Sequence, residues 1–169
     1  MPGPTWANRG ILSAICRPTR STKWWGRAAL IQSVDSVRLL DKIEAAAARL
    51  GMVQEILIEI NIGAEESKSG VGPEDLWPLL DAAAAKEHLR VRGLMAIPPA
   101  DADETATRRF FAAMRELLAK AAARGYERAQ MDVLSMGMSH DYAAAIEEGA
   151  TIVRVGTAIY GARDYSQKA

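Results

Sequence analysis

Short apolar runs alternate with alanine-rich, charged stretches along most of this chain. The apolar runs cover residues 30–34, 55–62, 90–97, 131–135 and 151–155, and β-branched side chains are frequent in them. Helix-forming residues dominate the stretches between them, at residues 36–50, 73–86, 103–124 and 141–148. Pro73 suits a first helical position, and Gly51, Gly125 and Gly149 suit helix ends. Near-continuous hydrophobic strands separated by helices predict an α/β fold with a parallel sheet, either doubly wound or closed as a barrel.

Two neighbouring strand-to-helix turns near the end of the sequence carry candidate binding chemistry. The first lies in Leu134-Ser-Met-Gly-Met-Ser-His-Asp141, where Ser139 and Asp141 suit the first turn of the helix that follows. Capping that helix is the plainer interpretation of Ser139, and it is compatible with a role in binding. The second turn lies in Thr151-Ile-Val-Arg-Val-Gly-Thr-Ala-Ile-Tyr-Gly161.

In this second turn, Gly156 and Thr157 stand where backbone N–H groups are free of helical partners. Two adjacent turns of this kind form a cradle for an anion, and phosphate suits it best. Arg154 adds a planar cation at the edge of the cradle. Packing alone would also explain Gly156, and a structural ion pair would explain Arg154. The pattern nevertheless favours Ser139, Arg154, Gly156 and Thr157 as phosphate-binding residues.

The two motifs closely resemble those of the pyridoxal phosphate (PLP) homeostasis proteins, which are single-domain relatives of the N-terminal barrel of alanine racemase. The resemblance extends from about Ile31 to Tyr165 in family-like order. Its upstream motifs are Ile31-Gln-Ser-Val-Asp-Ser36, Ile58-Glu-Ile-Asn-Ile62, Glu66-Ser-Lys-Ser-Gly70 and Arg92-Gly-Leu-Met-Ala-Ile97.

This resemblance implies a (β/α)8 barrel with its phosphate site after the last two strands. It implies functional groups at the carboxyl ends of the strands, at Asn61, Met95, Ser139 and Arg154. In the alanine racemase relatives, the arginine that matches Arg154 faces the pyridine nitrogen of PLP. That contact keeps the nitrogen unprotonated and makes the ring a weaker electron sink.

The beginning of the chain departs from the family pattern. The five strand–helix units correspond to about strands four to eight, so we expect a partial barrel. The family's first strand carries the Schiff-base lysine, and nothing before Ile31 resembles that segment. Lys68 matches a loop position in the family. Lys42, Lys86 and Lys120 fall on solvated helix faces, and Lys23 lies in the foreign segment. We therefore expect PLP binding to be non-covalent at best.

Residues 1–30 contain no acidic side chain and show no strand or helix periodicity. Read in a shifted frame from Arg9 to Gly26, permitted codons encode a sequence that resembles the family's third-strand motif, Trp-His-Phe-Ile-Gly-x-Leu-Gln-x-Asn-Lys. We expect residues 1–30 to be an out-of-frame or disordered non-family segment, and residues 31–169 to be the C-terminal part of a PLP-binding barrel. A divergent N-terminus and a basic targeting peptide are the alternatives.

Composition narrows the setting of this barrel. The 21 basic and 21 acidic residues balance, so neither nucleic acid nor a membrane surface is indicated as a partner. The single cysteine, Cys16, fits a reducing compartment, and we expect a cytoplasmic protein that is monomeric if complete. His88 and His140 have no second ligand at metal spacing, so no metal site is expected.

Together these features predict a PLP-binding protein of intracellular PLP and amino/keto acid homeostasis, without catalytic residues of its own. Two alternatives remain open. One is a fragment of a PLP-dependent racemase-like enzyme, which would need an acid/base from a further domain. The other is a non-functional frameshifted product, because a barrel that lacks strands exposes sheet edges and interior side chains.

Overall fold

The chain folds as a parallel sheet with helices between its strands. The computed structural model describes residues 11–12 and 28–161. The strands are β1 (Ile11–Leu12), β2 (Leu30–Val34), β3 (Gln54–Ile60), β4 (Leu89–Ala96), β5 (Ala129–Met138) and β6 (Ile152–Arg154). The helices are α1 (Val37–Arg49), α2 (Leu76–Ala84), α3 (Glu104–Ala123), α4 (Tyr142–Glu147) and α5 (Thr157–Tyr160).

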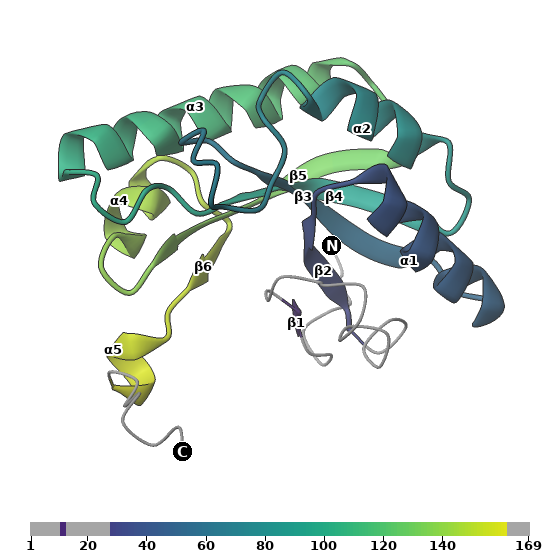
Figure 1. The fold of residues 1–169 in the computed structure, drawn as a ribbon, viewed down its shortest axis with the longest axis horizontal. Helices are drawn as coiled ribbons and strands as arrows, with labels where there is room; N and C mark the ends of the chain where they lie inside the picture. Colours follow the sequence, from purple (N-terminus) through teal and green to yellow (C-terminus); the bar gives the residue numbers. More distant parts are fainter. Residues whose placement is uncertain (1–10, 13–27, 162–169) are drawn as a thin grey trace.

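All strand pairings are parallel, and the strands lie in sequence order from β1 to β6. Helices α1, α2 and α3 lie along one face of the sheet (Figure 1). The sheet curves strongly, with the helices on its convex side. The curvature is evident from a hydrogen bond between Gln32 on β2 and Ser135 on β5, since β3 and β4 lie between these two strands. The described part of the chain is therefore an open section of a curved, helix-covered parallel sheet.

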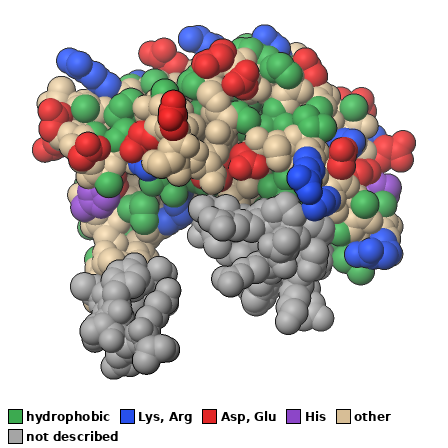
Figure 2. Space-filling model, in the orientation of Figure 1, with side chains coloured by type: hydrophobic (Ala, Val, Ile, Leu, Met, Phe, Trp, Pro, Cys, Tyr) green, Lys and Arg blue, Asp and Glu red, His purple; other side chains and the backbone are tan. Residues whose placement is uncertain are grey.

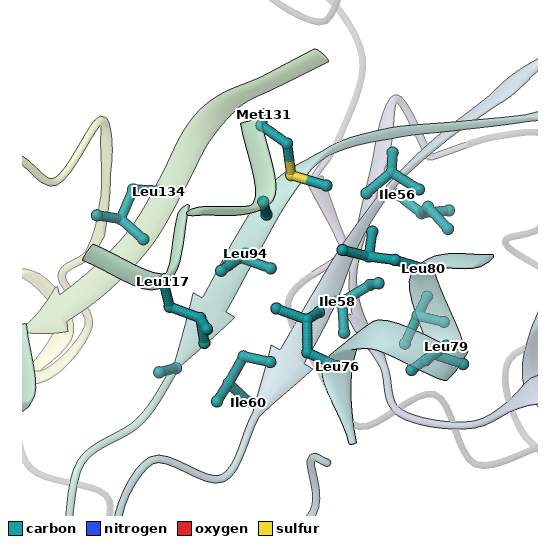
Figure 3. Packing of buried hydrophobic residues seen from close by; sticks show 14 of the residues in the cluster. Ile56, Ile58, Ile60, Leu76, Leu79, Leu80, Leu94, Leu117, Met131 and Leu134 are labelled. Atoms are coloured by element: carbon teal, nitrogen blue, oxygen red, sulfur yellow. The ribbon is translucent and has the colours of Figure 1, made fainter. Parts of the chain in front are cut away.

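The main hydrophobic core fills the space between the helices and the convex face of this sheet. Alternate residues of β3, Ile56, Ile58 and Ile60, point to that side and are at most 1% exposed. Leucines of α2 and α3 pack against them (Figure 3). Phe111 is the largest fully buried side chain on α3. This close packing fixes the positions of the strands. The side chains on the opposite, concave face of the sheet belong to a separate cluster.

Local signals place the ends of the helices. Ser36 caps α1 by accepting a hydrogen bond from the Leu39 N–H at 3.4 Å, and Asp103 caps α3 through the Ala106 N–H at 2.7 Å. The three glycines predicted at helix ends follow α1, α3 and α4, and each has a positive φ that L side chains rarely adopt (Gly51, Gly125, Gly149). Those predictions are confirmed.

Two expectations differ from the structure. Pro73 is not the first helical residue, because a turn closed by the Asp75 N–H and the Gly72 carbonyl precedes α2, which begins at Leu76. Strand β1 was not expected either: Ile11 pairs with Leu30 and extends the sheet beyond β2. The other residues of the segment 1–27, with the proposed frameshift, lie outside the described residues.

Charged side chains of both signs are mixed on the face of the molecule that Figure 2 shows. Figure 2 shows lysine and arginine side chains interspersed with aspartate and glutamate there, without a large field of one sign. None of the helices in residues 28–161 is both long and apolar enough to cross a membrane.

Candidate anion-binding site at the carboxyl ends of the strands

The concave face of the sheet is built in layers. Its middle layer is apolar and consists of Leu30, Leu57, Met95 and Val133, with Ile152 packed against them. Side chains two positions further along a strand point to the same face. Two positions after Leu30, Leu57, Val133 and Ile152 stand Gln32, Glu59, Ser135 and Arg154. A polar layer therefore lies at the carboxyl ends of the strands, above an apolar floor.

A third layer lies at the opposite, amino-terminal ends of the strands. Arg92 donates to Glu55 at 2.9 Å and forms two hydrogen bonds with Asp132. These contacts raise the pKa of Arg92, most strongly through the hydrogen bond to Asp132, and the same hydrogen bond lowers the pKa of Asp132. The apolar layer separates this ion cluster from the polar layer.

Hydrogen bonds connect most of the polar layer. Ser135 Oγ donates to Gln32 Oε1 at 2.8 Å and accepts from Arg154 Nη1 at 2.6 Å. Arg154 Nη2 also donates to the Ala96 carbonyl at 2.9 Å, so its guanidinium is fixed against β4 and β5. No carboxylate among the described residues forms a salt bridge with Arg154, so a structural ion pair does not explain this residue. Burial lowers the pKa of Arg154, while the charges of Glu59 and Asp141 oppose that shift.

Two buried atoms of the polar layer lack a hydrogen-bond partner among the described residues, Gln32 Nε2 and Glu59 Oε2. The side chain of Glu59 is only 6% exposed. Burial raises the pKa of Glu59 from 4.5 to about 7, the charge of Asp35 adds to this shift, and that of Arg154 opposes it. The site thus holds a carboxyl group that titrates near neutral pH.

The two predicted turns meet beside Arg154. The N–H groups of Gly156 and Ala158 both donate to Ser139 Oγ, at 3.0 and 3.3 Å. Ser139 therefore caps the start of α5. The sequence had predicted that it would cap α4 instead. Asp141 instead accepts from the Met138 N–H at 2.5 Å and closes the turn before α4.

Gly156 is open to approach from outside. A Cβ atom built on Gly156 would meet no described atom within 4 Å, and its φ of −120° does not require glycine. Tight packing among the described residues therefore does not explain this glycine. By contrast, a Cβ on Gly137 would lie 2.5 Å from Ala145 Cβ, so that glycine allows α4 to pack on β5. The space beside Gly156 N–H, the Ser139 hydroxyl and the exposed Thr157 can receive an anion.

The other residues expected at strand ends have structural surroundings. Asn61 fixes its own loop by donating to the Glu65 carbonyl at 2.8 Å and accepting from the Glu65 N–H at 3.2 Å. Met95 belongs to the apolar floor and is 1% exposed. Lys68 Nζ binds the Pro98 carbonyl at 3.0 Å and pairs with Glu65, so this lysine is engaged in the loops.

Three members of the polar layer were not among the predicted site residues: Gln32, Glu59 and Ser135. A signal for them was present. Each is a buried polar residue that stands two positions after a buried apolar residue of the same strand and so faces the same side. Because buried polar groups need partners, such residues indicate either a hydrogen-bond network or a ligand.

Comparisons with known proteins agree with this architecture. Residues 14–164 match the family described as alanine racemase, N-terminal domain. The pyridoxal phosphate homeostasis protein of Aquifex aeolicus is 45% identical over 140 residues, which cover 83% of this chain and 60% of that protein. The pyridoxal phosphate homeostasis protein of Pseudomonas aeruginosa is 44% identical over 140 residues, which cover 82% of this chain and 58% of that protein. The chain thus spans about 60% of the length of these curated relatives.

Among solved structures, PipY of Synechococcus elongatus without PLP superimposes with a TM-score of 0.84 at 29% identity, covering 90% of this chain and 71% of PipY. PipY with PLP bound gives a TM-score of 0.76 at 29% identity, covering 86% of this chain and 66% of PipY. The expected partial (β/α)8 barrel of the alanine racemase N-terminal type is confirmed.

Proposed function

This chain belongs to the alanine racemase N-terminal domain family, and from that premise we propose that it binds pyridoxal 5'-phosphate non-covalently. The observation that carries the proposal is the cradle formed by Gly156 N–H, Ala158 N–H and Ser139 Oγ. N–H groups at the start of a helix favour a phosphate, and an adjacent hydroxyl can donate a further hydrogen bond. In this proposal the phosphate lies against Ser139, Gly156 and Thr157, and the guanidinium of Arg154 faces the pyridine nitrogen.

The residues present fit such a ligand. Open space beside Gly156 admits the phosphate, and Arg154 is already oriented by Ser135 and Ala96. An arginine donates hydrogen bonds and does not accept them, so its partner nitrogen stays unprotonated. When bound, PLP supplies an electron-withdrawing ring, and this contact makes the ring a weaker electron sink.

We therefore propose a role in binding and balancing the cellular supply of PLP and of amino and keto acids, in the cytoplasm, and no turnover of a substrate. Relatives named pyridoxal phosphate homeostasis proteins support this role. We assign no catalytic residue to the chain.

Substitution of Gly156 by alanine tests the cradle with little disturbance of the fold. A methyl group has room there and needs no positive φ, so we expect the thermal unfolding midpoint to stay unchanged. The same methyl group occupies the space proposed for the phosphate, so the affinity for PLP in equilibrium dialysis should fall about tenfold or more. Ser139→Ala should weaken PLP binding in the same way, and exposed Ser67→Ala is the matched control.

Two results would contradict the proposal. One is PLP affinity that Gly156→Ala and Ser139→Ala leave unchanged. The other concerns the non-covalent mode: borohydride treatment of the PLP complex, followed by intact-mass measurement, should leave the mass of the chain unaltered. A stoichiometric mass increase on one lysine would show a covalent attachment.

A further inference from the structure

A buried carboxyl group shares the concave face of the sheet with Arg154. Glu59 and Arg154 face the same side, because each stands two positions after a residue of the apolar layer, Leu57 and Ile152 respectively. The side chain of Glu59 is 6% exposed, and its Oε2 atom lacks a hydrogen-bond partner among the described residues. Ionisation of such a group is costly, because neither water nor a donor stabilises the charge. The charge of Glu59 therefore depends on the charges around it.

Arg154 connects Glu59 electrostatically with the cradle. Glu59, Met95 and Ser135 stand in register on three neighbouring strands, and Ser135 Oγ accepts a hydrogen bond from Arg154 Nη1 at 2.6 Å. Gly156, whose N–H belongs to the cradle, follows Arg154 by two residues. No carboxylate among the described residues forms a salt bridge with Arg154. Its positive charge therefore acts both on Glu59 and on an anion in the cradle.

The other charges at this end of the sheet act against the ionisation of Glu59 or do not reach it. Asp35, which follows β2, repels the negative charge of Glu59, and Arg154 attracts it. Asp141, in the turn after β5, acts on Arg154. The uncharged side chains of this layer on β2, β4 and β5 are Gln32, Met95 and Ser135. An anion bound near Arg154 adds its repulsion to that of Asp35 and so favours the protonated form of Glu59.

We propose that Glu59 takes up a proton when an anion binds at the cradle, so that the affinity for PLP falls as the pH rises above neutrality. This inference rests on the proposed function and goes beyond it by assigning a regulation to the same site. The proton comes from the solvent and returns to it when the anion leaves. While Glu59 is neutral, the charge of Arg154 is available to the anion. Once Glu59 is ionised, it repels the anion and partly neutralises Arg154.

The range of pH follows from the burial of Glu59. Burial, with the charge of Asp35, raises the pKa of Glu59 to about 7, so the two protonation states exchange near neutral pH. A bound anion that raises this pKa by about one further unit makes the affinity about tenfold higher for protein with protonated Glu59 than for protein with ionised Glu59. Below neutral pH Glu59 is protonated with or without the anion, and its effect disappears.

The test compares PLP binding by the wild-type 169-residue protein and by Glu59→Gln, which stays neutral. Titration calorimetry covers the range from about pH 5.5 to about pH 9. The affinity of the variant divided by that of the wild type should be near one in acid and should rise through neutral pH toward about tenfold. The ionisation of PLP itself affects both proteins and cancels in this ratio. Exposed Glu66→Gln is the matched control, and its ratio should stay near one throughout.

Two further measurements separate proton uptake from a structural role of Glu59. Calorimetry in buffers of different ionisation enthalpy counts protons, and at about pH 7.5 the wild type should take up about half a proton more per PLP than Glu59→Gln. Asp35→Asn should move the rise of the affinity ratio between Glu59→Gln and this background to lower pH, because the charge of Asp35 helps to raise the pKa of Glu59.

The outcomes distinguish this inference from the proposed function. If Glu59→Gln changes the affinity for PLP by the same factor at every pH, or leaves it unchanged, Glu59 has only a structural role and this inference alone is overturned. Equal proton uptake by the two proteins would overturn it as well. If PLP binds to neither protein at any pH, the proposed function fails and the inference fails with it.

Discussion

Replacement of Glu59 by glutamine should stabilise the protein above neutral pH, because it removes a buried charge while nearly conserving side-chain volume. The pKa of Glu59 is raised from 4.5 to about 7 in the folded protein, first by burial and then by the charge of Asp35. Each unit of difference between the pKa values of the folded and unfolded states corresponds to about 1.4 kcal/mol. The wild-type protein should therefore lose about 3 kcal/mol of unfolding free energy on full ionisation of this group.

The sign follows from which state binds the proton more tightly. The folded state retains the proton up to about pH 7, whereas the unfolded chain releases it near 4.5. The contribution of Glu59 to stability is thus fully present below about pH 4.5 and is lost as the pH rises through about 7. Glutamine does not titrate, so the variant lacks this loss.

Urea unfolding followed by circular dichroism measures the effect between about pH 4 and about pH 8. The free energy of unfolding of Glu59→Gln minus that of the wild type should become more positive by about 3 kcal/mol over this range. Glu66→Gln should follow the wild type at every pH, because Glu66 is exposed. Parallel curves for wild type and Glu59→Gln would refute the reasoning, since they would show that Glu59 is solvated in the folded state.

Three further predictions concern the fold. Gly93→Ala should abolish cooperative unfolding in a urea titration, because the added Cβ would lie 1.8 Å from the Val133 carbonyl oxygen across the β4–β5 pairing. The control Gly125→Ala, whose Cβ meets no atom within 4 Å, should lower the unfolding free energy by only about 1 kcal/mol. Phe111→Ala should lower the unfolding free energy by about 3–5 kcal/mol, and an effect below about 1 kcal/mol would mean that α3 does not pack as described. Asp132→Asn should destabilise the protein at neutral pH, because Arg92 lowers the pKa of Asp132, and the difference from wild type should shrink as the pH falls through that lowered pKa; a difference that persists in acid would contradict an electrostatic cause.

The strands and helices were largely predictable because each carries a local signal. The five apolar runs became β2 to β6, with boundaries that differ by three residues at most, and Ser36 and Asp103 capped helices where the sequence indicated a start. The predicted start of α2 at Pro73 was wrong, because a proline suits both the first turn of a helix and a tight turn that precedes one. Strand β1 has only two residues, Ile11 and Leu12, which are too few to produce a periodic pattern.

The site was predictable only where its residues lie close in the sequence. The turns around Ser139 and Gly156 were recognised from their glycines and hydroxyls, but the bond between them crosses 17 residues and depends on the pairing of β5 with β6. The bond between Gln32 and Ser135 spans 103 residues and depends on the curvature of the sheet. Periodicity shows that a side chain faces the concave side, and only the folded sheet shows which side chain it meets there.

The serine at the cradle bears on how a bound anion would leave. Ser139 Oγ already accepts the hydrogen bonds of Gly156 N–H and Ala158 N–H. In the proposed site a phosphate would take over these N–H groups and the displaced hydroxyl would donate to it, so the new hydrogen bonds are partly offset by the two that are lost. On departure the hydroxyl resumes its place, and α5 keeps its cap. In the proposed PLP site this exchange of acceptors would keep the net gain on binding small, which suits reversible binding.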